Sequence, residues 1–272
     1  MNSGLRLLDS YIISGMQFFI VAIAALITSG LTLFSGFGLG TLLVPVFIIF
    51  FPVEVAISLV AIVHFLNNLF KLSLFGKHAD RPVVLRFGLP AIVAALVGAR
   101  ILVLLSGLEP LATYQLFGQD FQLTPVKLVI AFLMAFFALF EVVPSLEKIS
   151  FDAKYLSLGG IISGFFGGLS GHQGALRSAF LIRYGLSKES FIATGVVIAV
   201  LVDISRITVY FSALPRADFV ENGPILLTAV IAAFFGVFIG SRLVEKITIR
   251  TIKVIVSIML FGIAIALGLG II

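Results

Sequence analysis

Apolar residues in this chain run in long unbroken stretches and do not alternate with polar ones. Runs of about 20 apolar residues cross a bilayer as α-helices, whereas the strands of membrane barrels alternate. Two of the runs, 39–51 and 174–184, are too short to span. The pattern predicts an all-α, polytopic integral membrane protein. The apolar runs are 12–34, 39–51, 54–76, 84–106, 126–145, 155–169, 174–184, 190–212, 224–243 and 252–271.

Each short run follows a cluster of glycines. The first cluster reads Ser35-Gly36-Phe37-Gly38-Leu39-Gly40, and the second reads Ser170-Gly171-His172-Gln173-Gly174. Glycine permits both a sharp turn and a close approach of backbones. We therefore predict a helix, a break and a half-helix that turns back at each cluster. Broken backbone at membrane depth is tolerated only where it is buried in protein or lines a cavity.

The two halves of the chain resemble each other around these breaks. A shift of 135 residues aligns the two serines and several later polar positions, and a later match needs a shift of 142. Loops absorb such a length change cheaply. We predict two membrane repeats, 1–150 and 151–272, within one transmembrane domain, each with one broken hairpin and three spanning helices. The matching pairs are Glu54 and Glu189, Asn68 and Asp203, Lys71 and Arg206, and Gly98-Ala99-Arg100 and Gly240-Ser241-Arg242.

The charges of the loops indicate orientation. Loops 76–86 and 242–253 carry mostly Lys and Arg, and loop 146–154 carries two lysines and two acidic residues. Loop 107–124 carries acidic residues alone, and loop 213–223 is mixed. Basic loops face the cytoplasm. The assignment predicts an inverted repeat with both termini outside. A parallel arrangement, with fully spanning hairpins, stays open.

Composition supports a membrane protein and excludes several functional classes. Of 272 residues, 60% are hydrophobic and 11% charged, against roughly 45–50% and 25% in soluble domains. Cysteine is absent and the three histidines are scattered, so we expect no disulfide, metal site or cofactor. The net charge of +5 is spread among loops, which indicates orientation and not binding to nucleic acid. No Walker motif points to ATP.

The first apolar run could be a secretory signal, because Arg6 precedes an apolar stretch from Tyr11. No A-x-A-like cleavage site follows, and the stretch matches a helix of the second repeat. We expect it to be retained as the first helix of a multi-pass protein of the cell (inner) membrane.

The breaks are candidate substrate sites. A half-helix that begins after glycine presents unpaired N–H groups and the positive end of its dipole, which together attract an anion. The alternative is that the glycines only allow tight packing of helices. The predicted substrate-binding residues are Ser35, Gly36, Gly38, Gly40, Ser170, Gly171, His172, Gln173, Gly174 and Arg177.

Arg177 and His172 are the chemically informative members of this set. A cation at mid-membrane is costly, so Arg177 should face a cavity, where its planar fork suits an oxyanion. The alternative is an arginine that snorkels to headgroups. His172 could donate to an anion or carry a proton. It could equally be a neutral histidine satisfied by backbone carbonyls.

A second polar group lies on later helices. Asp203 and Arg206 share a helix face and can neutralise each other. If transport is linked to protons, His172 and Asp203 are the candidates. The supporting polar residues of this region are His64, Asn67, Asn68, Lys71 and Arg206. Arg100 and Arg242 end their helices and are expected to be interfacial anchors.

Gly168-Leu169-Ser170-Gly171 matches the G-x-S-G pattern of rhomboid-type intramembrane serine proteases. A serine nucleophile needs a base within hydrogen-bond reach. In that class the histidine lies on a later helix, and no histidine follows His172. The protease is therefore a secondary hypothesis.

The chain resembles the sulfite exporter TauE/SafE family of membrane permeases over essentially its whole length. The resemblance rests on the break from Gly36 to Pro45, the break from Ser170 to Phe180, Glu189, Thr194-Gly195 and the duplicated layout. His172-Gln173 departs from a plain glycine-rich form. The resemblance implies a permease, often for sulfur-containing anions such as sulfite or sulfonates.

These observations predict a secondary transporter of a small anion, with a sulfur oxyanion or organosulfonate such as sulfite as the leading substrate. Its partners would be the lipid bilayer, the anion and possible coupling protons. The alternatives are the intramembrane protease and a non-transporting membrane scaffold.

Overall fold

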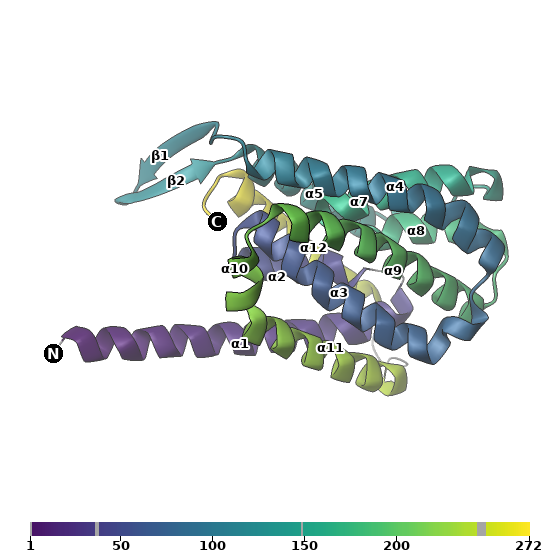
Figure 1. Ribbon diagram of the computed structural model, residues 1–272, viewed down its shortest axis with the longest axis horizontal. Helices are drawn as coiled ribbons and strands as arrows, with labels where there is room; N and C mark the ends of the chain where they lie inside the picture. The colour runs from purple at the N-terminus through teal and green to yellow at the C-terminus, as the bar shows by residue number, and fades with distance from the viewer. Residues whose placement is uncertain (1, 36–37, 148, 244–248) are drawn as a thin grey trace.

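The computed structural model describes residues 2–35, 38–147, 149–243 and 249–272. Its helices run side by side in a bundle, with a β-hairpin at one end (Figure 1). The first half contains α1 (Asn2–Ser35), α2 (Leu39–Ile48), α3 (Val53–Phe75), α4 (Arg81–Ser106), β1 (Ala112–Leu116), β2 (Gln119–Leu123), α5 (Pro125–Val142) and α6 (Pro144–Glu147). The second half contains α7 (Leu156–Ser170), α8 (Gly174–Leu181), α9 (Lys188–Ala213), α10 (Arg216–Glu221), α11 (Gly223–Leu243) and α12 (Ile249–Gly268). Three 3₁₀ turns cover Gly76–His78, Ala153–Tyr155 and Ile182–Tyr184.

The predicted all-α membrane fold is present. Among the described residues, five helices are long and apolar enough to cross a membrane. They lie in α1, α3, α4, α9 and α11, while the apolar parts of α2, α5 and α12 are shorter. Because water cannot satisfy the backbone in a bilayer, helices that bond internally are the stable form of such segments.

Local sequence signals fix where several helices begin. The Asp80 side chain accepts from the Val83 N–H at 2.9 Å, and Thr124 accepts from Lys127 in the same way at 3.4 Å. Proline follows each cap within the first turn, where its missing N–H has no helical partner to lose. These caps explain why the apolar runs predicted to begin at 84 and 126 start within three residues of helices α4 and α5, whereas α1 begins ten residues before its predicted run.

Both predicted breaks occur between a long helix and a half-helix. Helix α2 begins after Gly38, which is extended, and helix α8 begins three residues after α7 has ended. Gly171 has φ of +81° and its N–H donates to Gly167 O, so it ends α7 in a left-handed conformation that favours glycine. A Cβ atom on Gly40 would lie 2.9 Å from Gly171 O. The two breaks therefore lie against each other.

Glycine also lets the long helices touch. Helix α7 packs along α4, where added Cβ atoms on Gly160, Gly164 and Gly168 would come within 2.1–2.2 Å of carbonyl oxygens of α4. Helix α1 packs on α11 through Gly30 and Gly236 in a similar way. Small residues permit such close crossings in membranes. Helix α4 of the first predicted repeat packs on the first helix of the second, α7, and α11 of the second repeat packs on the first helix of the first, α1. The inversion of the repeats itself stays a prediction.

Two loops contain structure that the sequence interpretation left out. Loop 107–124 forms the hairpin of β1 and β2, paired antiparallel from Ala112 with Leu123 to Leu116 with Gln119. Tyr114 Oη donates to Leu269 O at 2.5 Å, which ties the hairpin to the end of α12. Loop 213–223 contains α10. Both elements are too short and too polar to stand out in a scan for apolar runs.

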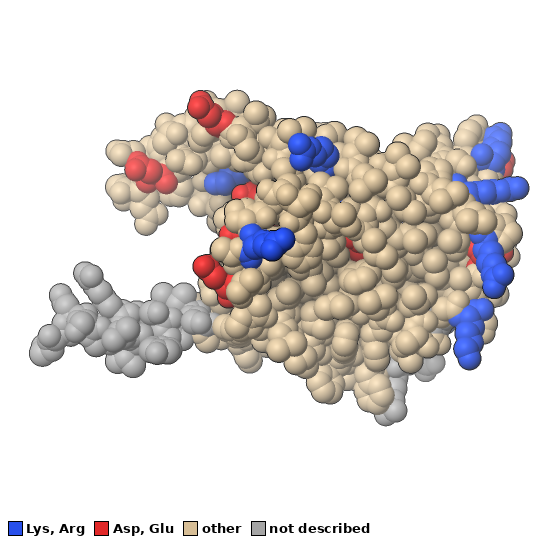
Figure 2. Space-filling model, in the orientation of Figure 1, with Lys and Arg blue, Asp and Glu red and all other residues tan. Residues whose placement is uncertain are grey.

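Charge is distributed unevenly between the ends of the bundle. On the face shown in Figure 2, Lys and Arg predominate at one end, while the other, here called the acidic end, carries most of the visible Asp and Glu together with some Lys and Arg. Figure 1 places the hairpin, α10 and both ends of the chain at the acidic end. This arrangement matches the loop charges from which an outside position of the termini was predicted.

We expect Gly164→Ala to lower the apparent melting temperature of the detergent-purified protein. The new methyl group would meet Ala91 O at 2.2 Å, and overpacking of this kind costs about 1–3 kcal/mol or more. The matched control is Gly262→Ala in α12, because no heavy atom lies within 4 Å of that added Cβ. Equal melting temperatures for the two variants would contradict the packing of α7 on α4.

Candidate functional site

Helix α3 carries three polar side chains on one buried face. His64, Asn68 and Lys71 are spaced by four and three residues, which places them one above another. They are 4%, 5% and 6% exposed. Ionisable groups inside membrane proteins are costly and face protein or water, and not lipid. This face of α3 is therefore the starting point of the site.

Helix α9 brings an ion pair opposite this face. Arg206 donates to Asp203 Oδ1 through Nε at 3.0 Å and Nη2 at 2.8 Å. Arg206 Nη1 also donates to Gly167 O, and both side chains are completely buried. The predicted neutralisation of Asp203 by Arg206 is confirmed.

The Asp203 carboxylate also joins α3 to the second break. His64 Nδ1 lies 2.6 Å from Oδ2, and Asn68 Nδ2 donates to Oδ2 at 3.3 Å. Gln173 Nε2 donates to Oδ1 at 3.4 Å. The sequence alignment of Asn68 with Asp203 thus corresponds to a direct contact. Donors from α3, α9 and the second break all meet on one carboxylate.

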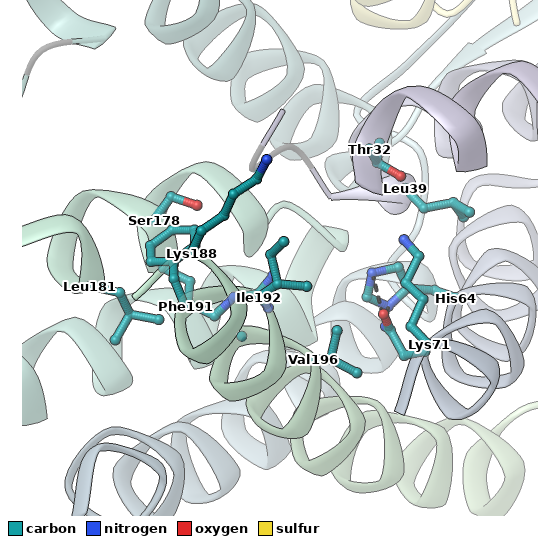
Figure 3. A pocket seen from close by; sticks show the side chains of 13 residues that line it. Thr32, Leu39, His64, Lys71, Ser178, Leu181, Lys188, Phe191, Ile192 and Val196 are labelled. Atoms are coloured by element: carbon teal, nitrogen blue, oxygen red, sulfur yellow. Dashed lines mark hydrogen bonds between the residues drawn. The ribbon is translucent and has the colours of Figure 1, made fainter. Parts of the chain in front are cut away.

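A cavity of about 130 Å³ lies beside this cluster (Figure 3). Lys71 and His64 reach it from α3, and Lys188 reaches it from the first turn of α9, as Figure 3 shows. Arg177 contributes from α8. Within the described ranges, no acidic side chain lines the cavity. The full lining is Thr32, Leu39, His64, Asn68, Lys71, Arg177, Ser178, Leu181, Lys188, Phe191, Ile192, Gly195 and Val196.

Arg177 is held between α8 and α9 with part of its guanidinium unpaired. A Cβ atom on Gly195 would lie 3.4 Å from Arg177 Nε, so the guanidinium packs over this glycine. Arg177 Nη1 is buried and has no hydrogen-bond partner. Among the described residues, no carboxylate lies within ion-pair distance of Arg177 or Lys71. A buried unpaired donor is costly, so a ligand that accepts from it would bind favourably.

The polar residues of the second break are buried beside the cavity and do not line it. His172 Nδ1 lies 3.1 Å from Ser170 Oγ, and the ring stacks on Phe137 at 4.9 Å. The main-chain oxygen of Gln173 accepts from Ser163 Oγ at 3.0 Å. His172 Nε2 has no hydrogen-bond partner. These side chains position the break against its neighbours.

The remaining predicted residues fall into three groups. Gly38 and Gly40 lie at the crossing of the breaks, close to Gly174 and Gly171 respectively. Asn67 is turned away from its neighbour Asn68 and accepts from Ser29 Oγ at 3.0 Å. Gly36 lies outside the described residues, as does the side chain of Ser35. Of the predicted substrate-binding residues that the structure describes, Arg177 alone lines the cavity, joined there by His64, Asn68 and Lys71 from the supporting set.

A family model described as "Sulfite exporter TauE/SafE" matches residues 19–267. The chain belongs to the TauE/SafE sulfite exporter family. It is therefore a multi-pass membrane transporter of the permease type. No curated protein and no solved structure matches the chain.

In this TauE/SafE protein the serine of the G-x-S-G pattern is not arranged as a nucleophile. Ser170 Oγ donates its proton to Phe166 O at 3.1 Å, and so accepts from His172 Nδ1. An activated serine would instead give its proton to the histidine. Ser170 is also completely buried. The geometry gives the protease hypothesis no support.

Lys188 is the main site residue that the sequence interpretation missed. It lies in the first turn of α9, where the positive end of the helix dipole opposes a cation. A lysine in the first turn of a helix does not stabilise that helix, and this unfavourable placement is the sequence feature that could have identified Lys188. Thr32 and Ser178 were missed because single hydroxyl groups in apolar helices are common and carry no pattern.

We expect Asp203→Asn to lower the apparent melting temperature far more than a surface change. It leaves the buried Arg206 without its counter-charge, and breaking a buried pair on one side costs about 3–5 kcal/mol. The double change Asp203→Asn and Arg206→Gln should recover part of this loss. A control at exposed Asp120, changed to Asn, should have little effect. Equal melting temperatures for Asp203→Asn and the parent would contradict the pairing.

Proposed function

We propose that this protein is a secondary transporter that moves a small oxyanion, with sulfite or a related sulfur oxyanion as substrate, across the cytoplasmic membrane. The observation that carries the proposal is the cavity, which is lined by Lys71, Arg177 and Lys188 and by no described acidic side chain. The family match supports a transporter and leaves the substrate to be argued from chemistry.

The charges around the cavity favour an anion. Asp203 and Arg206 cancel each other, so two cations remain, the buried Lys71 and the partly buried Arg177. Each cation at membrane depth costs about 2.5–3.5 kcal/mol even on the lenient insertion scale. An oxyanion in the cavity would offset this cost, and a guanidinium can donate to two of its oxygens at once.

The size of the cavity favours a compact substrate. A cavity of about 130 Å³ has room for several water molecules, since about 10–15 Å³ measured in this way is enough for one. Sulfite or a similar ion fits this space together with some water.

The position of the cavity suggests which side it serves. Lys71 comes from the last turns of α3 and Lys188 from the first turn of α9. Both helix ends lie close to the end of the bundle where Lys and Arg gather (Figures 1 and 2). Every residue of α2 is buried, and α2 lies between the cavity and the acidic end. We infer a cytoplasm-facing state, with movement of one half of the bundle against the other giving access to the far side.

The scaffold alternative does not account for these charges. A protein that only holds partners would gain nothing from a buried Lys71 and a partly buried Arg177 that have no counter-charge among the described residues. Its helices could be packed by apolar and small residues alone.

Anion binding to the purified protein tests the proposal. We expect sulfite, sulfate, thiosulfate or isethionate to raise the apparent melting temperature, because a ligand that binds the native state stabilises it by mass action. Acetate, a carboxylate, is added in a parallel measurement for comparison with the sulfur oxyanions. Arg177→Ala should weaken binding of the stabilising anion by about ten- to a hundredfold, as expected for loss of a hydrogen bond to a charged group.

Arg183→Ala is the matched control, because Arg183 lies on the same segment but is exposed and outside the cavity. It should bind as the parent does. No stabilisation by any of the sulfur anions, or equal loss in the two arginine variants, would contradict the proposed site.

A further inference from the structure

We infer that His64 binds a proton together with the anion, so that substrate and proton occupy the cavity as a pair. This inference rests on the proposed function and adds to it the identity of the coupling ion and the group that carries it. The sequence indicated His172 and Asp203 as candidate proton carriers and gave His64 only a supporting role. Here the proton carrier is His64.

His64 is placed both at the cavity and on the buried carboxylate. It lines the cavity, while its Nδ1 lies 2.6 Å from Asp203 Oδ2. Asp203 is ionised by its pairing with Arg206, so His64 Nδ1 carries a hydrogen and donates it. Nε2 is then the ring nitrogen that takes up a further proton. Histidine is the side chain whose charge ordinarily changes near neutral pH.

Asp203 itself is poorly suited to release a proton. Its two oxygens accept from Arg206, His64, Asn68 and Gln173. Hydrogen bonds to a carboxylate stabilise its charged form. Protonation of Asp203 would also break the pair with Arg206 and leave a buried cation. Its role is to orient His64 and to stabilise the imidazolium once it forms.

His172 lacks the required access. Its ring is 2% exposed, stacks on Phe137 and donates to Ser170, and it is not part of the cavity lining. A proton on its free Nε2 would have no described acceptor. His64, in contrast, can donate from Nε2 to an anion bound in the cavity.

The charged groups that face His64 make its proton depend on the anion. Lys71 lies on its own helix, Arg206 and Lys188 on α9, and Arg177 on α8, with Asp203 as the one described carboxylate. From α1 and α2 the cavity receives Thr32 and Leu39, which are uncharged. Without an anion, the surrounding cations disfavour a positive charge on His64. A bound anion offsets this repulsion, so the anion and the proton each strengthen the binding of the other.

Asn68 positions the His64 ring. Its Nδ2 lies 3.0 Å from Nδ1 and 3.3 Å from Nε2, and it donates to Asp203 Oδ2 at 3.3 Å, so it packs against the ring and the carboxylate together. Once Nε2 carries a proton, it becomes a donor to an anion bound in the cavity. The paired loading also balances charge, because one proton offsets one negative charge brought by the substrate.

Proton uptake on anion binding tests this inference. Purified protein in weak buffer near pH 7 is titrated with sodium thiosulfate, whose own charge is constant there, and in parallel with sodium sulfite against a protein-free blank. We expect uptake of about one proton for each anion bound. By reciprocity, thiosulfate affinity should be about ten- to a hundredfold higher at about pH 6 than at about pH 8.

His64→Gln should bind thiosulfate with little pH dependence and without proton uptake. His64→Lys, which supplies a fixed cation next to Asp203, should bind thiosulfate at about pH 8 as the parent does at about pH 6, again without uptake. Native melting curves in both variants establish that they are folded. His78→Gln, a change of an exposed loop histidine, should behave as the parent.

The outcomes separate the two proposals. Anion binding with no proton uptake, or uptake that persists in His64→Gln and disappears in His172→Gln, would overturn the assignment of His64 and leave the anion transporter intact. Absence of binding by every sulfur anion would overturn the oxyanion site itself, and this inference with it.

Discussion

The structure depends on one buried carboxylate. Asp203 holds together α3, α9 and the second break, through hydrogen bonds from His64, Asn68, Arg206 and Gln173. A single negative charge in an apolar bundle is stable only when its partners are fixed around it. The same partners form one wall of the cavity. The interaction that stabilises the centre of the bundle therefore also sets the geometry of the proposed substrate site.

Glycine makes this convergence possible. The breaks bring Gly40 against Gly171, and the close crossing of α4 with α7 is built on glycines that face carbonyl oxygens. Larger residues would hold these backbones apart and open the cluster around Asp203. Leu39 is the one described residue of the α2 N-terminus that lines the cavity, and the cations of the side chains dominate its lining.

The sequence predicted the helices well because membrane helices obey a simple rule of length and polarity. The breaks were visible because glycine clusters interrupt apolar runs, and the contact of Asn68 with Asp203 followed from aligning the two halves. The hairpin of β1 and β2 was missed because short polar strands lack a distinctive period. The site was predicted in part. Arg177 stood out as a costly charge, but the presence of Lys188 and Lys71 in the same cavity lining arises only from tertiary packing. His172 looked functional from its position in the break, yet its side chain packs on Phe137 and is not part of the cavity lining.

The central claim is that the cavity selects anions by its charge, and thiol modification measures this most directly. The chain has no cysteine, so Ile192→Cys would place a single thiol in the cavity lining. Its modification rate is compared for an anionic and a cationic methanethiosulfonate of similar size. The account predicts faster reaction with the anionic reagent, and loss of that preference when Lys71 and Arg177 are both changed to Met. Equal rates in the parent background, or faster reaction with the cationic reagent, would contradict it.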